Sequence, residues 1–367
     1  MSKRSVAIVC GGTAGHVYPV LAVADAYRES VDDIDVHLIG TPSGYEIRVV
    51  DRYAYHLNLI GGSPVLRVGA LRKVVGLISI GRGVYQARKL LKEKSVDLVI
   101  GFGGYASAGV LVAARSLGIP SAIHESNAKP GLTNELLGSL ADRIYVGFNA
   151  AAQWFPEART RIVGNPTRSD IAELASIPRL APFSNNRPIR LLVTGGSNSS
   201  EFFNDHIPSM LQRVTQQGVS LDVLHQVGQN DPVPTRTMYE RLGVQASVVP
   251  HIEDMVDAHK WADFAITRAG SGTLGELAAS GLPALIVPLA NAARDHQTAN
   301  AREFAASGGG WWISETEWDT KKVAGRVARI LADEEVWQNA SDSARSFASP
   351  NAAMAMVADC EALMASA

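Results

Sequence analysis

The sequence predicts an α/β protein built from two doubly wound, Rossmann-like domains. Short apolar runs alternate with amphipathic segments along most of the chain, which is typical of parallel β-α-β units. The runs at residues 5–10 and 190–194 each lead into a glycine-rich turn and then a helix, so the two halves repeat one scheme. A chain of 367 residues also exceeds one ordinary core, and two domains are the default at that length.

The composition narrows the functional classes. Hydrophobic residues make up 46% of the chain and charged residues 19%, as in globular proteins. A net charge of −2 gives no reason to expect nucleic acid as a partner. No stretch approaches eighteen uninterrupted apolar residues, so no membrane-spanning helix is predicted. The two cysteines, Cys10 and Cys360, lie near opposite ends of the chain and are expected to be reduced thiols.

The first half contains its expected elements in regular order. The run at 5–10 is continuously apolar, as for a strand covered on both faces. Residues 17–29 are expected to form an amphipathic helix with Pro19 in its first turn, and a second helix is expected at about 107–117. The remaining strands are expected at residues 35–40, 55–60, 97–101, 120–124, 143–146 and 161–163.

The pattern lapses between residues 172 and 190, a stretch rich in proline and asparagine that we interpret as a linker. The predicted domains are residues 1–168 and 169–349. Three helical segments follow residue 313, and the last of them, about 350–367, is expected to pack back on the first domain. The second half restarts with a helix expected at 201–216 and strands at 190–194, 221–226, 247–250, 264–266 and 284–287.

The stretch from Arg268 to Pro283 combines a short strand, a glycine-rich turn and a helix N-terminus. Main-chain N–H groups and the helix dipole at such a turn form a socket for an anion, usually a phosphate. A second polar loop, with Asp295, His296 and Gln297, follows the next strand and is expected at the same end of the sheet. The alternative is that the glycines only form a tight turn.

Glu276 and Arg168 each have two interpretations. Glu276 lies one turn into its helix, where the dipole favours a carboxylate in any case. Alternatively, its carboxylate accepts two hydrogen bonds from the vicinal hydroxyls of a ribose. Arg168 follows Gly164-Asn-Pro-Thr at the predicted domain junction, and either neutralises phosphate charge or ties the linker down.

The turn Gly11-Gly-Thr-Ala-Gly-His16 resembles a phosphate-binding turn. It lacks the Gly-Lys-Ser/Thr ending of a nucleotide triphosphatase loop and the Gly-x-Gly-x-x-Gly spacing of a dinucleotide site. His16 ends the turn at a helix N-terminus, where the dipole lowers the pKa of an imidazole and keeps it neutral, as a general base requires. The alternative is a histidine that caps or packs the helix.

Polar residues follow the strand at 120–124, in the sequence His124-Glu-Ser-Asn127. Buried strand ends seldom hold three polar groups without a partner for each. Glu125 and Asn127 either hold a polar acceptor or brace the turn at Gly103-Gly104 against the neighbouring strand.

Residues 64–94 are the one basic region of the chain, with apolar residues interleaved. They form either an ordinary solvated helix or a surface that lies on anionic lipid. On such lipid each basic side chain near the surface contributes about 1 kcal/mol to the binding free energy. Gly76, Gly81 and Gly83 weaken the helix and favour a partly loop-like surface. The basic side chains of the region are Arg67, Arg72, Lys73, Arg82, Arg88, Lys89, Lys92 and Lys94.

Together these motifs resemble, in family order and over nearly the whole chain, the MurG family of N-acetylglucosaminyltransferases. The motifs are Gly11-Gly-Thr-Ala-Gly-His-Val-Tyr-Pro19, Gly103-Gly-Tyr-Ala-Ser107, His124-Glu-Ser-Asn127, Gly164-Asn-Pro-Thr-Arg168, Gly195-Gly-Ser197, Arg268-Ala-Gly-Ser-Gly-Thr-Leu-Gly-Glu276 and Asp295-His-Gln-Thr-Ala-Asn-Ala301.

The resemblance implies an inverting, metal-independent GT-B glycosyltransferase that uses no cofactor. Such an enzyme moves N-acetylglucosamine from UDP-N-acetylglucosamine to lipid I, forming lipid II in bacterial peptidoglycan synthesis. The resemblance further implies that the first domain binds a polyprenyl-pyrophosphate-linked acceptor and the second binds the donor. It also implies peripheral association with the cytoplasmic face of the inner membrane.

Carried over by position, His16 is the candidate base and Asn127 lies near the acceptor. The resemblance places further acceptor contacts at Gly103, Gly104, Tyr105 and Glu125. It places donor contacts at Thr13, Gly15, Arg168, Ser197, Ile252, Gly270, Ser271, Thr273, Glu276, His296 and Gln297, with Glu276 on the ribose and the main chain near Ile252 on the uracil. It places membrane contacts at Arg67, Arg72, Lys73, Leu77 and Ile78.

The chain departs from the family pattern at Ala14, at Asn198-Ser-Ser200, at Ser126 and at Ala108-Gly109. Most of these departures fall in the first domain. They keep open a second hypothesis, a related transferase that glycosylates another acceptor, such as a natural-product intermediate. A UDP-sugar-binding protein without activity is a third hypothesis, and a nucleotide-sugar epimerase of the same fold is a fourth.

Overall fold

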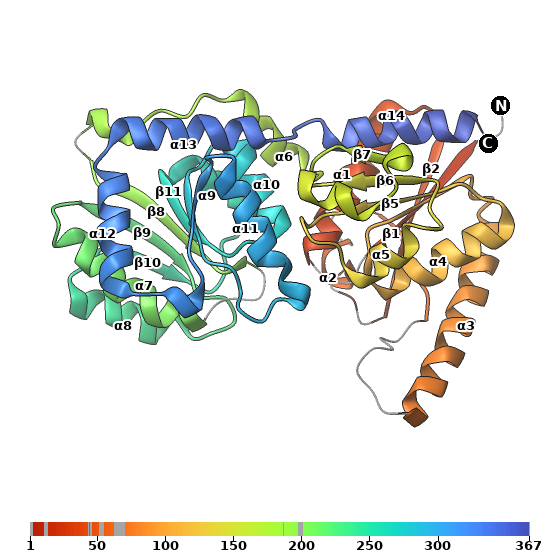
Figure 1. The fold of residues 1–367 in the computed structure, drawn as a ribbon, viewed down its shortest axis with the longest axis horizontal. Coiled ribbons are helices and arrows are strands. Elements are labelled where there is room, and N and C mark those ends of the chain that lie inside the picture. The colour runs from red at the N-terminus through yellow and green to blue at the C-terminus, as the bar shows by residue number, and fades with distance from the viewer. Residues whose placement is uncertain are drawn as a thin grey trace. The chain divides into compact units, whose positions relative to one another are not determined.

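The computed structural model describes residues 3–10, 14–42, 44, 46–50, 55–61, 70–185, 187–196 and 201–366. The chain divides into two compact units (Figure 1). The first contains Met1–Arg168 and Asn351–Ala367, and the second contains Ser169–Pro350.

The first unit is built on a seven-stranded parallel sheet in the order β3-β2-β1-β4-β5-β6-β7. The order reverses between β1 and β4, so the loops after these two strands lie at the switch point of a Rossmann-type sheet. The strands are β1 Arg4–Val9, β2 Ile34–Gly40, β3 Leu57–Leu59, β4 Leu98–Gly101, β5 Ser121–Glu125, β6 Arg143–Val146 and β7 Thr160–Ile162.

Both faces of this sheet are covered, which explains the unbroken apolar run in β1. Val6 and Ile8 pack in one buried cluster, whereas Ala7 and Val9 pack in another on the opposite face. The helices of the unit are α1 Ala14–Ser30, α2 Glu46–Val49, α3 Ala70–Glu93, α4 Gly104–Leu117, α5 Leu132–Leu137 and α14 Ala352–Ala365.

Helix α14 packs against α1 and belongs to the first unit (Figure 1). The carboxylate of Asp359 holds it to strand β6, because Oδ2 accepts a hydrogen bond from Tyr145 at 2.8 Å and pairs with Arg143 Nε at 2.8 Å. Both cysteines are free and buried. Burial raises the pKa of the Cys360 thiol to about 12 and also raises that of Cys10.

Helix α3 differs from the partly loop-like segment that the sequence predicted. The glycines at 76, 81 and 83 suggested a partly loop-like segment, but the main chain is helical without a break from Ala70 to Glu93. Packing against α4 accounts for the difference, because tertiary contacts override the weak helix propensity of glycine. At Gly83, a Cβ atom would lie only 2.6 Å from the carbonyl oxygen of Gly61, so this glycine permits a close approach of two segments.

The second unit repeats the architecture with a six-stranded parallel sheet in the order β10-β9-β8-β11-β12-β13. Its switch point lies between β8 and β11. The strands are β8 Ile189–Thr194, β9 Leu221–Gln226, β10 Ala246–Val249, β11 Phe264–Thr267, β12 Ala284–Ile286 and β13 Gly310–Trp312. The helices are α6 Ser169–Ala172, α7 Glu201–Thr215, α8 Pro232–Leu242, α9 Met255–Trp261, α10 Ser271–Ser280, α11 His296–Ala306, α12 Thr320–Leu331 and α13 Glu334–Phe347.

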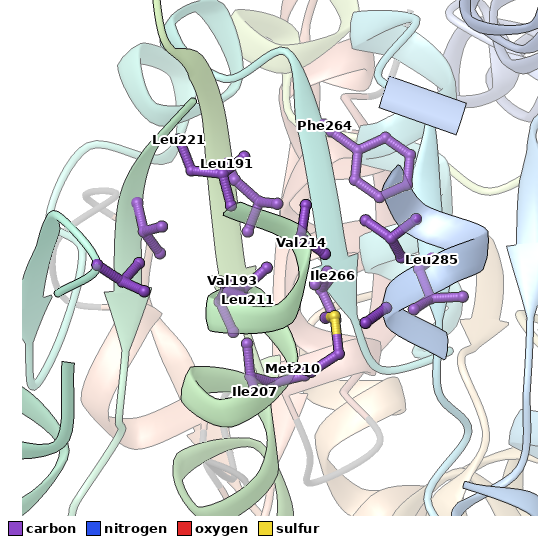
Figure 2. Close-up of a cluster of buried hydrophobic side chains, with 14 of the residues drawn as sticks. Leu191, Val193, Ile207, Met210, Leu211, Val214, Leu221, Phe264, Ile266 and Leu285 are labelled. Atoms are coloured by element: carbon purple, nitrogen blue, oxygen red, sulfur yellow. The ribbon is translucent and has the colours of Figure 1, made fainter. Parts of the chain in front are cut away.

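Helical spacing builds the core of this unit on one face of its sheet. Ile207, Met210, Leu211 and Val214 recur at the spacing of one helix face in α7, and all four are fully buried. They pack against the strand side chains Leu191, Val193, Phe264, Ile266 and Leu285 (Figure 2).

The expected linker at 172–190 belongs to the second unit. Arg345 of α13 donates hydrogen bonds to the carbonyl oxygens of Leu174 and Ala175, which fixes this segment on the unit. Within the described ranges, no helix combines the length and the apolar character needed to cross a membrane. The prediction of two doubly wound α/β domains is confirmed.

Candidate functional site

In the first unit, the predicted polar segments follow β1, β4 and β5, three neighbouring strands of one parallel sheet. The carboxyl ends of these strands lie at one edge, where ligands bind in doubly wound sheets. His16 lies in the first turn of α1 and is half-buried, and Gly15 beside it is exposed. Thr13 lies outside the described residues.

His124 links the strand end of β5 to this edge. The ring is fully buried, with Nε2 3.1 Å from the carbonyl oxygen of Gly164 and Nδ1 3.2 Å from Oγ of Ser126. Burial lowers the pKa of His124 to about 4, against a raising effect of the Gly164 bond, and the charge of His16 lowers it further. The electrostatic effect of His16 on His124 means that these two side chains lie at the same edge of the sheet.

This low pKa makes the first unit sensitive to acid. An unfolded histidine titrates near 6.5, so on acidification the unfolded chain binds this proton before the folded chain does. The stability that the neutral, buried His124 gives the folded state is fully present above pH 6.5. The free energy of unfolding then falls by about 3 kcal/mol as the pH falls towards 4. Urea unfolding at pH 7.5 and pH 4.5 should show this loss, and the loss should shrink in His124→Gln. An equally steep pH dependence in that variant would contradict the assignment.

Glu125 braces the loop that follows β5. Its carboxylate is 2% exposed and accepts four hydrogen bonds, which hold residues 127–134 around it. Oε1 accepts from the main-chain N of Asn127 at 2.8 Å and from its Nδ2 at 3.0 Å. Oε2 accepts from the N of Gly131 at 3.0 Å and from Nδ2 of Asn134 at 2.9 Å. Glu125 therefore holds its own loop and positions Asn127, and none of these four bonds reaches the turn at Gly103-Gly104.

The turn after β4 requires its two glycines. Gly103 and Gly104 have φ angles of 83° and 73°, in the left-handed region that favours glycine. The hydroxyl of Tyr105 donates to Oγ1 of Thr41 at 3.2 Å, and the main-chain N of Thr41 donates to Oε1 of the buried Glu46 at 2.8 Å. The sequence analysis did not identify Glu46, although its partner Thr41 lies in the same β-α unit.

Arg168, the last residue of the first stretch of this unit, extends towards α1. Its guanidinium carbon lies 5.4 Å from the ring centroid of Tyr18, two residues after His16. A cation–π contact of this kind fixes the side chain near the N-terminal turn of α1.

In the second unit, the loops after β11 and β12 are joined by two amide side chains. Oε1 of Gln297 accepts from the main-chain N of Ala269 at 3.3 Å and of Leu289 at 3.0 Å. Nδ2 of the fully buried Asn300 donates to the carbonyl oxygen of Ala269 at 3.0 Å. These bonds fix the peptide just before Gly270, the residue that caps helix α10. Asn300 belongs to the second polar motif, but its role was not recognised from the sequence.

The N-terminus of α10 has the form of the predicted anion socket. Ser271 is buried at the first helical position and Thr273 is half-buried in the first turn. Main-chain N–H groups at such a helix N-terminus are the groups that bind phosphate in phosphate-binding turns. His296 lies at the start of α11, half-buried, with Nδ1 2.7 Å from the carbonyl oxygen of Ala293.

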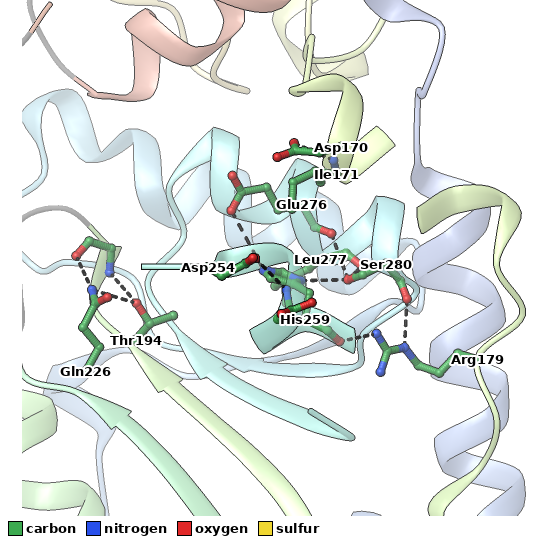
Figure 3. Close-up of polar contacts among 12 residues, drawn as sticks. Asp170, Ile171, Arg179, Thr194, Gln226, Asp254, His259, Glu276, Leu277 and Ser280 are labelled. Atoms are coloured by element: carbon green, nitrogen blue, oxygen red, sulfur yellow. Dashed lines mark hydrogen bonds and ion pairs between the residues drawn. The ribbon is translucent and has the colours of Figure 1, made fainter. Parts of the chain in front are cut away.

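Gln226, at the end of β9, connects two further loops of this edge (Figure 3). Its Nε2 lies 3.3 Å from the carbonyl oxygen of Gly196, and its Oε1 accepts from the main-chain N of Ile252 at 2.9 Å. The main-chain N–H of Ile252 therefore has a partner within the protein. Ser197 lies outside the described residues.

Glu276 lies on α10, and its side chain is 22% exposed. Its Oε2 is 4.0 Å from Nε2 of His259, a buried residue of α9 that the sequence analysis did not identify (Figure 3). Among the residues that the structure describes, no group of three or more His, Cys, Asp or Glu side chains is arranged to hold a metal ion.

Two Rossmann-type units, each with polar loops at its switch point, form the GT-B fold. The family model described as "Glycosyltransferase family 28 N-terminal domain" matches residues 6–146, and the model described as "Glycosyltransferase family 28 C-terminal domain" matches residues 190–356. The chain belongs to glycosyltransferase family 28, and the resemblance stated from its motifs is confirmed.

Curated relatives match the chain over nearly its full length. Those from Magnetococcus marinus and Tolumonas auensis are both 37% identical, over 356 and 364 residues. The alignments cover 97% and 99% of this chain and 96% and 100% of the relatives. Both relatives are named UDP-N-acetylglucosamine–N-acetylmuramyl-(pentapeptide) pyrophosphoryl-undecaprenol N-acetylglucosamine transferase. The crystal structure of Acinetobacter baumannii MurG is 31% identical, with a TM-score of 0.79 over 96% of this chain and 98% of that one.

Proposed function

We propose that this chain transfers N-acetylglucosamine from UDP-N-acetylglucosamine to N-acetylmuramyl-(pentapeptide) pyrophosphoryl-undecaprenol, the lipid I acceptor, and so forms lipid II. The observation that carries the proposal is the 37% identity to transferases of that name, which extends through both units.

One departure from the family pattern is compatible with this acceptor. Ser126 replaces a residue of the His-Glu-x-Asn segment, but its side chain points inward. It is 2% exposed, and its hydroxyl contacts Nδ1 of His124. The substitution is therefore an internal adjustment of the unit and does not alter a surface that an acceptor could touch.

In the proposed reaction, His16 acts as general base. The acceptor hydroxyl oxygen attacks the anomeric carbon of the donor sugar while its proton passes to His16. The bond from the anomeric carbon to the β-phosphate oxygen breaks on the opposite face, so the configuration inverts and UDP leaves. Asn127, held by Glu125, orients the acceptor.

The leaving diphosphate is stabilised by the helix N-terminus at Gly270, Ser271 and Thr273, with Arg168 as a cation, and no metal ion is needed. Thr13, Gly15 and Ser197 supply further contacts to this region. Glu276 accepts from the ribose hydroxyls. The carbonyl of Ile252 meets the uracil, and His296 and Gln297 contact the sugar.

A transfer assay with several acceptors tests the proposal. UDP should be released from UDP-N-acetylglucosamine only in the presence of a muramyl-pyrophosphoryl-prenol, with a disaccharide-lipid product. Product from a soluble acceptor but none from lipid I would favour the related transferase. UDP released with inversion at C2 and without any acceptor would identify an epimerase.

We further propose that the first unit lies on the cytoplasmic face of the plasma membrane as a peripheral protein. The side chains of Arg67, Arg72, Lys73, Leu77 and Ile78 lie outside the described part of the structure. The described surface around α3, α4 and α5 supports the proposal, because it exposes large apolar side chains beside basic ones. Tyr85 is 70% exposed and Leu136 is 65% exposed, and Arg82 is also exposed on α3.

Binding to vesicles tests this membrane surface. Replacing both Arg72 and Lys73 by alanine should weaken binding to anionic vesicles about 30-fold, at about 1 kcal/mol for each charge. Binding of the unmodified chain should also fall as salt rises from about 0.05 to about 0.5 M. The matched control replaces Lys321 and Lys322, two exposed lysines of α12 in the second unit, and should bind as the unmodified chain does. Equal loss in both double variants, or no response to salt, would contradict the proposal.

A further inference from the structure

We propose that His259 is a positioning residue for the donor: it holds the carboxylate of Glu276 in the orientation that accepts the ribose hydroxyls. The inference rests on the proposed function, which places a ribose on Glu276, and identifies the group on which that contact depends.

His259 faces Glu276 from the neighbouring helix. Nε2 of the imidazole lies 4.0 Å from Oε2 of the carboxylate, and the His259 side chain is 1% exposed against 22% for Glu276 (Figure 3). One carboxylate oxygen is thus directed at a buried ring, while the side chain as a whole still reaches solvent. A carboxylate that accepts hydrogen bonds from two vicinal hydroxyls binds them more tightly with such an anchor, because its rotamer is fixed before the ligand binds.

His259 is itself held at its ring and at its main chain. Nδ1 lies 2.9 Å from Oγ of Ser280, the last residue of α10. Arg179 donates from Nη2 to the carbonyl oxygen of His259 at 2.7 Å and from Nε to that of Ser280 at 2.8 Å. One guanidinium therefore joins the main chains of the two helices that present the pair. Burial lowers the pKa of Arg179 to about 10, which leaves it charged at neutral pH.

The tautomer of the ring decides how His259 meets Glu276. The hydroxyl of Ser280 lies 2.9 Å from Nδ1 of His259 and has one proton, which it donates either to this nitrogen or to the carbonyl oxygens of Glu276 and Leu277 at 2.9 and 3.2 Å. When Nδ1 accepts that proton, the single ring proton of the neutral imidazole is on Nε2 and faces the carboxylate of Glu276. In this tautomer one ring links the end of α10 to the side chain that meets the ribose.

Calorimetric titration with two ligands separates this role from a general effect on folding. The ligands are UDP and 2′,3′-dideoxy-UDP, which lacks the hydroxyls assigned to Glu276. His259→Asn retains a group near Nδ1 for Ser280 but does not reach Glu276. This variant should weaken the binding of UDP about tenfold and the binding of dideoxy-UDP less than about twofold. His259→Gln, whose amide reaches the Nε2 position, should restore most of the affinity for UDP.

Two further variants complete the test. Glu276→Ala should abolish the difference between the two ligands, and His259→Asn added to it should have no further effect on that difference. Ser280→Ala is a smaller change that removes the hydroxyl next to Nδ1, and it should also weaken the binding of UDP more than that of dideoxy-UDP. It serves as the test if His259→Asn does not fold. In the transfer assay, His259→Asn should raise KM for the donor with little change in kcat.

The outcomes distinguish this inference from the proposed function. An unmodified chain that does not bind UDP would overturn the proposed function and this inference with it. If the unmodified chain prefers UDP and Glu276→Ala removes the preference, the ribose assignment stands. Equal weakening of both ligands by His259→Asn and Ser280→Ala, or no weakening by either, would then overturn the role of His259 alone.

Discussion

Replacing His16 by alanine should lower kcat by about 10²- to 10⁴-fold, the range that a general base contributes. His16 lies in the first turn of α1, half-buried, and its charge acts on His124 at the same edge of the sheet. As the general base, its imidazole accepts the proton of the acceptor hydroxyl. Steady-state transfer rates at saturating donor and acceptor measure the effect.

UDP binding and the melting temperature of His16→Ala should stay near those of the unmodified chain, which assigns the loss to chemistry. His56→Ala is the matched control, because His56 is an exposed histidine of the same unit. An unchanged kcat in His16→Ala would remove this residue from the mechanism.

Replacing Glu125 by glutamine should cost about 3 kcal/mol of unfolding free energy and lower kcat about 100-fold. The change keeps the shape of the side chain but replaces one acceptor oxygen by an NH₂ group. That group would face donors from Asn127 on one side or from Gly131 and Asn134 on the other. The loop must shift to relieve the conflict, and Asn127 shifts with it.

Urea unfolding and steady-state kinetics measure the two effects of Glu125→Gln. The exposed Glu157 of the same unit offers a control, since Glu157→Gln removes the same charge without a buried acceptor. A stable Glu125→Gln variant with reduced activity would instead indicate that the carboxylate contacts the acceptor directly. Unchanged stability and activity would contradict the brace.

The sequence was sufficient for the architecture and for the loops at the switch points. Continuous apolar strands and glycine turns are local patterns, so the turns after β4 and β11 could be placed before the structure was known. The repeated strand-turn-helix order also predicted two domains of one kind.

The residues that support the site could not be placed in that way. Gln226, Asn300 and His259 act through partners from other strands and helices, and nothing in their immediate sequence distinguishes them from ordinary buried polar groups. The donors from Gly131 and Asn134 that hold Glu125 could likewise not be located from the sequence. Helix α3 was misjudged because helix propensity is local, whereas its packing against α4 is not.

The return of α14 to the first unit has a consequence for limited proteolysis. The chain passes between the units twice, at residues 168–169 and again at 350–351. A single cut at the first passage would yield two polypeptides, yet the carboxylate of Asp359 would still hold the C-terminal one to Tyr145 and Arg143. The nicked protein should therefore run as two bands on a denaturing gel and elute from a sizing column as one species. Only a second cut, near Pro350, would let the two halves be purified apart.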